Sequence, residues 1–195
     1  MRFVIGWLLV CTLHAGMDEQ HGATASGGQP LQTLPRSEDV LPAREVSRGS
    51  LVVTGDGYRF QVPPQLLHVD HPRSKLAYRG TVKGLLDPAE LTVYATREPF
   101  EGDLAALVRR EIARVQSRGG KISTNTPAQI HIDGKMSPAH RFFASGDVLG
   151  LYVLAVHQGH AYIFHADTPN TPTAFPNMGS DMMICGSTFH VSPPQ

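Results

Sequence analysis

Residues 148–167 constrain the fold more than any other part of the chain. Residues 148–157 and 160–167 are rich in β-branched and aromatic side chains, and Gln158-Gly159 between them predicts a hairpin with a two-residue turn. In that register both faces are apolar: His157/His160, Ala155/Tyr162 and Val153/Phe164 pair on one face, and Val156/Ala161, Leu154/Ile163 and Tyr152/His165 on the other. An antiparallel pair usually turns one face to water, so this hairpin predicts a covering layer on each side of its sheet.

Residues 103–118 predict one amphipathic helix, which would supply one of the two layers. Its apolar residues recur at helical spacing: Leu104, Leu107, Val108, Ile112 and Val115. Asp103 can cap its start, and Gly119-Gly120 suits its end. We expect the other layer to come from residues 64–71, from residues 175–185, or from both.

Further strand patterns occur along the rest of the chain. They cover residues 51–54 and 58–62 around an Asp-Gly turn, 75–82, 90–96, 128–133, 135–145 and 187–191. The predicted fold class is therefore α+β, an antiparallel β-sheet covered by helices on both faces (an α/β/α sandwich). We expect it to form a single domain over residues 49–192.

The N-terminal residues predict export to the periplasm or the extracellular space. Arg2 precedes an apolar run that is shorter than the roughly 20 residues a membrane span requires and matches a signal-peptide core of ~7–15 residues. We expect a signal peptide over residues 1–15, with a buried first helix or strand as the alternative. Residues 16–48 are polar and lack a sustained period, which predicts a flexible linker.

Leu8-Leu9-Val10-Cys11 leaves a second processing route open. The tetrapeptide resembles the lipobox of bacterial lipoproteins, although Val10 stands where a small residue is usual. Lipidation of Cys11 is thus the alternative to cleavage after Ala15, and membrane contact is expected only through this anchor or the signal segment. Either route removes Cys11 from disulfide pairing and leaves Cys185 alone, so no disulfide framework is predicted.

Charge and motifs exclude several function classes. The 17 basic and 17 acidic side chains give a formal net charge of zero, so no global field directs the chain to nucleic acid. The sequence contains no HExxH, CxxC, P-loop or nucleophile-elbow motif. We therefore predict no catalytic residue and no cofactor. The helix arginines (Arg109, Arg110, Arg114 and Arg118) are interpreted as a solvated surface, with an anion-binding face as the alternative.

His157 and His160 are the predicted metal-binding residues. They face each other across the turn, where Cβ atoms lie roughly 4.5–5.5 Å apart, so the two imidazoles could share one zinc or copper ion. Two ligands are fewer than the three or four of a functional zinc site. We expect weak, adventitious binding that does not survive dialysis.

The chain resembles the PsbP/Mog-type superfamily and its secreted bacterial DcrB-like relatives. The resemblance rests on residues 57–63 (Gly-Tyr-Arg-Phe-Gln-Val-Pro), the amphipathic helix, Ile132-Asp133-Gly134 and Ser187-Thr188-Phe189, and covers residues 50–191. It implies an α/β/α sandwich and mostly non-enzymatic docking, chaperoning or binding roles. The predicted function is an extracytoplasmic binding or accessory domain of the cell envelope with a protein partner or small ligand. A histidine-based metal-dependent hydrolase and a purely structural envelope protein are the alternatives.

Overall fold

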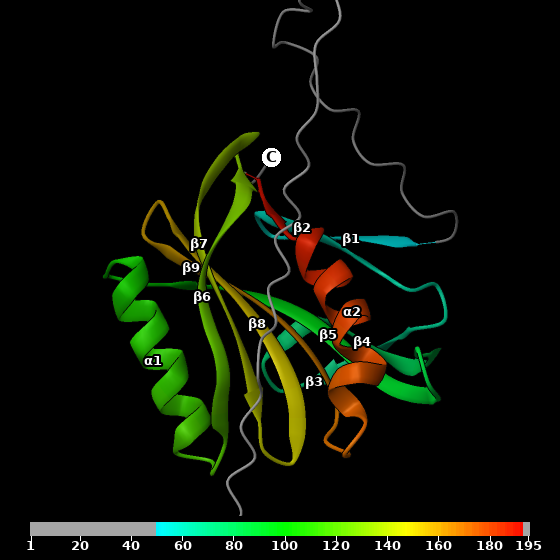
Figure 1. The fold of residues 1–195 in the computed structure, drawn as a ribbon. Coiled ribbons are helices and arrows are strands. Elements are labelled where there is room, and N and C mark those ends of the chain that lie inside the picture. Colours follow the sequence, from blue (N-terminus) through cyan, green and yellow to red (C-terminus); the bar gives the residue numbers. More distant parts are fainter. Residues whose placement is uncertain (1–49, 193–195) are drawn as a thin grey trace, which may run out of the picture. The chain divides into compact units, whose positions relative to one another are not determined.

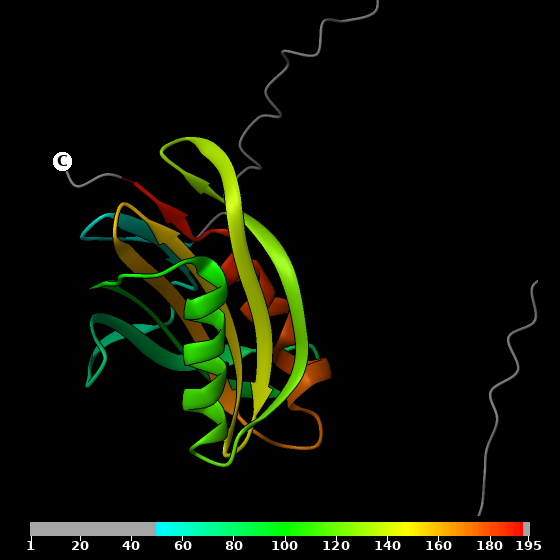
Figure 2. The ribbon, with the colours of Figure 1, turned by 90° about the vertical axis from the view of Figure 1, so that its left-hand side faces the viewer.

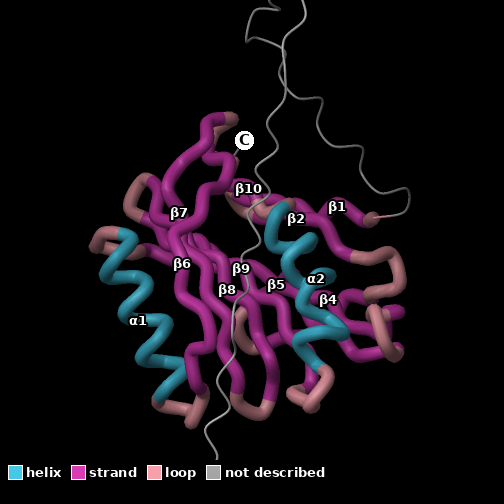
Figure 3. The backbone as a smooth tube through the Cα atoms, in the orientation of Figure 1, coloured by secondary structure: helices cyan, strands magenta, loops and turns pink. Residues whose placement is uncertain are grey.

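The computed structural model describes residues 50–192, in which ten strands form one sheet and two helices pack on it (Figures 1 and 3). The strands are β1 (Leu51–Gly55), β2 (Tyr58–Val62), β3 (Leu67–His71), β4 (Ser74–Lys83), β5 (Pro88–Pro99), β6 (Lys121–Ile132), β7 (Lys135–Ser145), β8 (Val148–His157), β9 (His160–Pro169) and β10 (His190–Val191); the helices are α1 (Leu104–Gln116) and α2 (Ala174–Ser187). The predicted signal peptide (residues 1–15), linker (16–48) and lipidation residue Cys11 lie outside the described residues. No helix among residues 50–192 is long and apolar enough to cross a membrane.

The β8–β9 hairpin lies near the centre of the sheet, whose strand order is β1-β2-β10-β6-β7-β8-β9-β5-β4-β3. His157 pairs with His160 and Tyr152 with His165, which confirms the predicted register. Gln158 and Gly159 both have positive φ angles, 48° and 73°. This conformation matches the twist of the two strands and explains why a glycine follows Gln158.

Helix α1 covers one face of the central strands. The Asp103 side chain accepts a hydrogen bond of 2.7 Å from the Ala106 amide and so begins the helix. Leu107 and Val108 belong to one apolar cluster with side chains of the sheet: Phe142, Ala144, Leu154, Ala161 and Ile163. The predicted helix is confirmed. It ends at Gln116, and Gly119 just beyond it has a positive φ angle of 79°.

Helix α2 packs against the opposite face, so the sheet lies between the two helices (Figure 2). Met178, Met182 and Cys185 are buried there together with aromatic side chains of the sheet. A Cβ atom on Gly186 would lie 2.9 Å from Cδ2 of Leu151, so a glycine lets the helix approach β8 closely. Of the two segments expected to cover this face, residues 175–185 do so.

The sheet also bends around α2 and covers part of that helix itself. Val53 and Phe60 of the first hairpin join the same apolar cluster as Met178. The Tyr58 hydroxyl donates a 3.0 Å hydrogen bond to the Ala95 carbonyl of β5, which is not a neighbour of β2 in the sheet. Strands β1 and β2 therefore do part of the covering that we expected of helices.

The predicted fold class is wrong in two respects. The sheet is mixed rather than wholly antiparallel, because β10 runs parallel to β6 while it runs antiparallel to β2. The described residues are mainly strand, and two helices are too few to form complete layers over ten strands. Bending of the sheet is the physical reason, because it buries apolar strand faces against other strands. Residues 67–71 likewise form an edge strand, β3, and not a covering layer.

Candidate functional site

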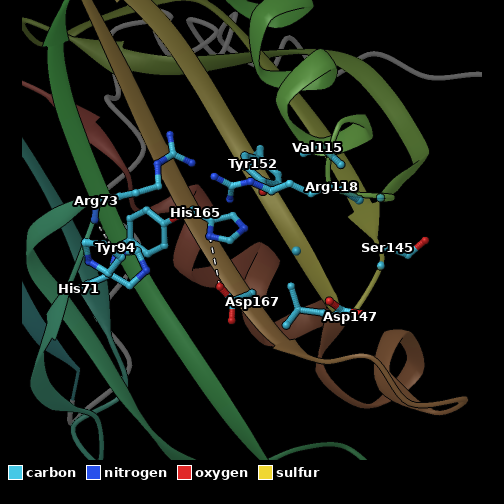
Figure 4. Close-up of a pocket in the computed structure, with 16 residues that line it drawn as sticks. His71, Arg73, Tyr94, Val115, Arg118, Ser145, Asp147, Tyr152, His165 and Asp167 are labelled. Atoms are coloured by element: carbon cyan, nitrogen blue, oxygen red, sulfur yellow. Dashed lines mark hydrogen bonds and ion pairs between the residues drawn. The ribbon is translucent and has the colours of Figure 1, made fainter.

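A pocket of about 390 Å³ opens at the C-terminal end of α1 (Figure 4). The end of α1 and the loop after it, the β3–β4 turn, and strands β5, β7, β8 and β9 meet there. Its polar lining residues are His71, Arg73, Tyr94, Arg118, Ser145, Asp147, Tyr152, His165 and Asp167. The site is therefore assembled from residues up to 96 positions apart, from His71 to Asp167.

Aromatic rings form a continuous ladder across the floor of the pocket. The register of the sheet places Tyr94, His165 and Tyr152 side by side on β5, β9 and β8. The ring centroids of His165 lie 4.9 Å from Tyr94 and 4.2 Å from Tyr152. Phe142 stacks on Tyr152 at 4.5 Å, and His71 lies 4.2 Å from Tyr94. The ladder holds the His165 ring in one orientation.

His165 is a buried imidazole with no hydrogen-bond partner for either ring nitrogen among the described residues. Its exposed fraction is 4%, and burial lowers its pKa to about 3, so the ring is neutral at physiological pH. A Cβ atom on Gly150 would lie 2.7 Å from Nε2. A glycine at position 150 thus makes room for the His165 ring, whose two nitrogens are buried without a partner, which is rare in folded proteins.

Asp167 lies beside His165 with the opposite pKa shift. Its Oδ2 atom is 3.3 Å from Nδ1 of His165, although no hydrogen bond joins them. Burial raises the pKa of this carboxyl to about 6. The pair therefore carries at most one negative charge at neutral pH, and not the ion pair that its spacing suggests.

Two arginines extend toward each other from opposite ends of the pocket (Figure 4). Arg73 is fixed by Glu111 of α1, whose fully buried carboxylate lies 3.4 Å from it and also pairs with Arg110 and Arg114. Arg118 has no carboxylate partner among the described residues. Burial raises the pKa of the Tyr94 and Tyr152 hydroxyls beside these arginines, so both stay protonated as donors.

Replacing Asp167 with asparagine is expected to stabilise the protein at pH 7.5 by about 1–2 kcal/mol. The folded-state pKa of about 6 exceeds the ordinary 3.8, so ionisation of Asp167 opposes folding fully above pH 6 and not at all below pH 3.8. The difference between Asp167→Asn and the parent should vanish by that lower pH.

His165 supplies an internal control for this pH series, because its effect on the free energy of unfolding changes with pH in the opposite direction to that of Asp167. Its folded-state pKa of about 3 lies below the ordinary 6.5, so its contribution is lost as pH falls from 6.5 toward 3. Urea unfolding of Asp167→Asn should show this loss without the compensating Asp167 contribution. Equal stability of the variant and the parent at every pH would contradict the assignment.

His157 and His160, the predicted metal-binding pair, lie opposite each other at the other end of the hairpin. Nε2 of His157 is 2.9 Å from Oδ2 of Asp133, and Nε2 of His160 is 3.2 Å from Nη2 of Arg97. Within residues 50–192, no group of three or more His, Cys, Asp or Glu side chains is arranged to hold a metal ion. The weak metal binding of this pair stays a prediction.

Several solved structures are similar to this chain. No family model matches it, and no curated protein matches it. Cyanobacterial PsbP from Synechocystis sp. PCC 6803 has 14% identity and a TM-score of 0.47, over 73% of this chain and 92% of that one. The Ran-binding protein Mog1p of Saccharomyces cerevisiae has 10% identity and a TM-score of 0.46, over 74% and 96%. LpqN of Mycobacterium tuberculosis, involved in cell envelope biogenesis, has 13% identity and a TM-score of 0.39, over 74% and 83%. PsbP and Mog1p, the proteins that give the predicted superfamily its name, are thus both among the solved structures similar to this chain.

Proposed function

We propose that this chain is an extracytoplasmic, non-enzymatic binding or accessory domain of the cell envelope, and that the pocket beside α1 holds a small organic anion. One observation carries the proposal: a buried, neutral His165 with two unused ring nitrogens lines a pocket that two arginines enter. Buried polar atoms without partners are rare in folded proteins. A ligand that fills this pocket would supply the missing partner.

The lining residues define the chemistry of that ligand. Guanidinium groups recognise carboxylates with two parallel hydrogen bonds, so Arg73 and Arg118 favour an anionic end. The rings of Tyr94 and Tyr152 offer flat apolar contact to an aromatic or planar body. A volume of about 390 Å³ lies within the range of small-molecule sites, roughly 300–1,000 Å³. A small aromatic carboxylate meets all three conditions.

Benzoate is therefore expected to bind, whereas benzamide, its neutral isostere, is not. Titration of the ¹⁵N-labelled protein with each compound should shift the amide signals of the pocket with benzoate alone. Replacing Arg118 with glutamine should weaken benzoate binding by about tenfold or more, because a charge-assisted pair contributes roughly 1.5–3 kcal/mol.

Arg109→Gln is the matched control, because Arg109 lies on α1, shortly before Arg118 in the chain, but does not line this pocket. It removes the same charge and should bind benzoate as the parent does. Equal binding of benzoate and benzamide would contradict the anionic ligand. If Arg109→Gln and Arg118→Gln weakened benzoate binding equally, the loss would be due to the change in net charge and not to a contact with Arg118. Turnover of a bound compound would contradict the non-enzymatic role.

The extracytoplasmic part of the proposal is supported by the sequence of residues 1–15 and is tested by intact mass. Protein recovered from the periplasm or the medium should lack residues 1–15 if signal peptidase cleaves after Ala15. A diacylglyceryl mass on Cys11 would indicate the lipoprotein route instead. A full-length product confined to the cytoplasm would contradict both.

A further inference from the structure

Four side chains lie in a row across four neighbouring strands, far from the pocket in the register of the sheet. They are Arg59 of β2, His190 of β10, His131 of β6 and Met136 of β7, each paired with the next across the sheet. Figure 3 shows β2, β10, β6 and β7 side by side in the upper part of the molecule. Because paired residues project from the same face, these four side chains share one surface.

The two histidines of this row are placed to act together. Their ring centroids are 5.2 Å apart, and Nδ1 of His190 is buried without a hydrogen-bond partner among the described residues. A ring nitrogen of a neutral imidazole that makes no hydrogen bond can offer its lone pair to a metal ion. Neutral imidazoles are the form that binds metals.

Met136 completes the row on the other side of His131. Its side chain is 54% exposed, which is high for a residue that contributes to stability by burial. Its thioether sulfur is a soft ligand, and soft sulfur ligands select Cu(I) among the biological metal ions. Two imidazoles and a thioether on adjacent strands therefore form a three-ligand set that neither zinc nor magnesium prefers.

We propose that His131, His190 and Met136 form a surface site for Cu(I). Arg59, next in the row, favours this oxidation state, because its positive charge repels a divalent ion more strongly than a monovalent one. The site is open to solvent on the side of Met136, so the ion can be taken up and released without unfolding. It differs from the His157 and His160 pair, whose Nε2 atoms already face Asp133 and Arg97.

The test is an anaerobic competition titration of the full chain against a chromophoric Cu(I) chelator. All proteins should carry Cys11→Ser, because a free thiol would itself bind Cu(I); Cys185, the other cysteine, is buried and is kept in every protein. We expect one Cu(I) per chain, and an affinity about tenfold or more lower in Met136→Leu, a loss of about 1.4 kcal/mol. His131→Gln and His190→Gln should abolish the site.

Two controls make the outcome decisive. Met136→Leu changes only an exposed side chain, so it should fold as the parent does and leave weak Zn²⁺ binding unchanged. A variant with both His157→Ala and His160→Ala should keep its affinity for Cu(I). The proposal is overturned if the parent fails to compete for Cu(I), if Met136→Leu binds Cu(I) as tightly as the parent, or if the His157/His160 variant is the one that loses it.

Discussion

Replacing Glu111 with alanine is expected to lower the free energy of unfolding by about 3 kcal/mol. The carboxylate is fully buried and is the shared partner of Arg73, Arg110 and Arg114, at 3.4, 2.9 and 3.2 Å. Its removal leaves three guanidinium groups close together with their common counter-charge gone. Because all three arginines reach solvent in part, we expect the lower end of the 3–5 kcal/mol range of broken buried pairs.

Glu98→Gln is the matched control for Glu111→Ala. The Glu98 carboxylate also pairs with Arg110 but is partly exposed, so its removal should cost less than about 1 kcal/mol. Urea unfolding followed by far-UV circular dichroism measures both, since the only tryptophan, Trp7, lies in the predicted signal peptide. Equal losses in the two variants would show that burial of Glu111 does not determine its effect. Glu111→Ala should also weaken benzoate binding, because Arg73 loses its anchor.

Replacing Phe164 with alanine is expected to cost about 3–5 kcal/mol, because a fully buried aromatic side chain leaves a cavity that the sheet cannot close. The Phe164 ring lies at the centre of the larger apolar cluster, 5.6 Å from both Phe60 and Phe189. These rings come from β2, β9 and the segment before β10, so Phe164 links the first and last parts of the described residues. The urea midpoint should fall while the slope of the transition stays unchanged.

Phe175→Ala controls for the loss of an aromatic ring as such. Phe175 is 54% exposed and touches Phe143 at an edge, with a centroid distance of 5.3 Å. Its truncation should cost about 1 kcal/mol. A loss in Phe164→Ala no larger than this would contradict the central place of Phe164 in the core.

Local sequence patterns were sufficient to predict most of the strands and helix α1, but not how the helices and strands pack on one another. The β8–β9 register and the Asp103 cap depend on residues close in sequence, and both are confirmed. Helix α2 lacks a side-chain cap, and it is only weakly amphipathic. Its helical state depends on burial of Met178 and Met182 against the sheet, which no local pattern reveals.

The bending of the sheet was equally hidden from the sequence. It depends on contacts such as that between Tyr58 and Ala95, which are 37 residues apart. The short strand β10 contributes only two residues, and its parallel pairing with β6 has no periodic signature. These two features account for the error in the predicted fold class.

The candidate site was predictable only in part. Pairing of Tyr152 with His165 followed from the hairpin register, but the sequence does not place Tyr94 or Arg73 beside them. The arginines of α1 were interpreted as a solvated surface, whereas Arg110 and Arg114 pair with a buried carboxylate. Glu111 is the residue that the helical pattern concealed, because a glutamate next to an apolar stripe ordinarily points to water.

Because β10 lies between β2 and β6 in the sheet, the strands of this chain cannot all pair in the order in which they are synthesised. The hairpin β1–β2 is synthesised first among the described strands, yet its only strand pairing with the rest of the sheet is through His190 and Val191. Until those residues leave the ribosome, β2 and β6 each keep an unpaired edge, and such edges recruit other chains. Strands β1 and β2 therefore cannot pair with the rest of the sheet until β10 has been synthesised, and a nascent chain stopped before His190 would be prone to aggregate.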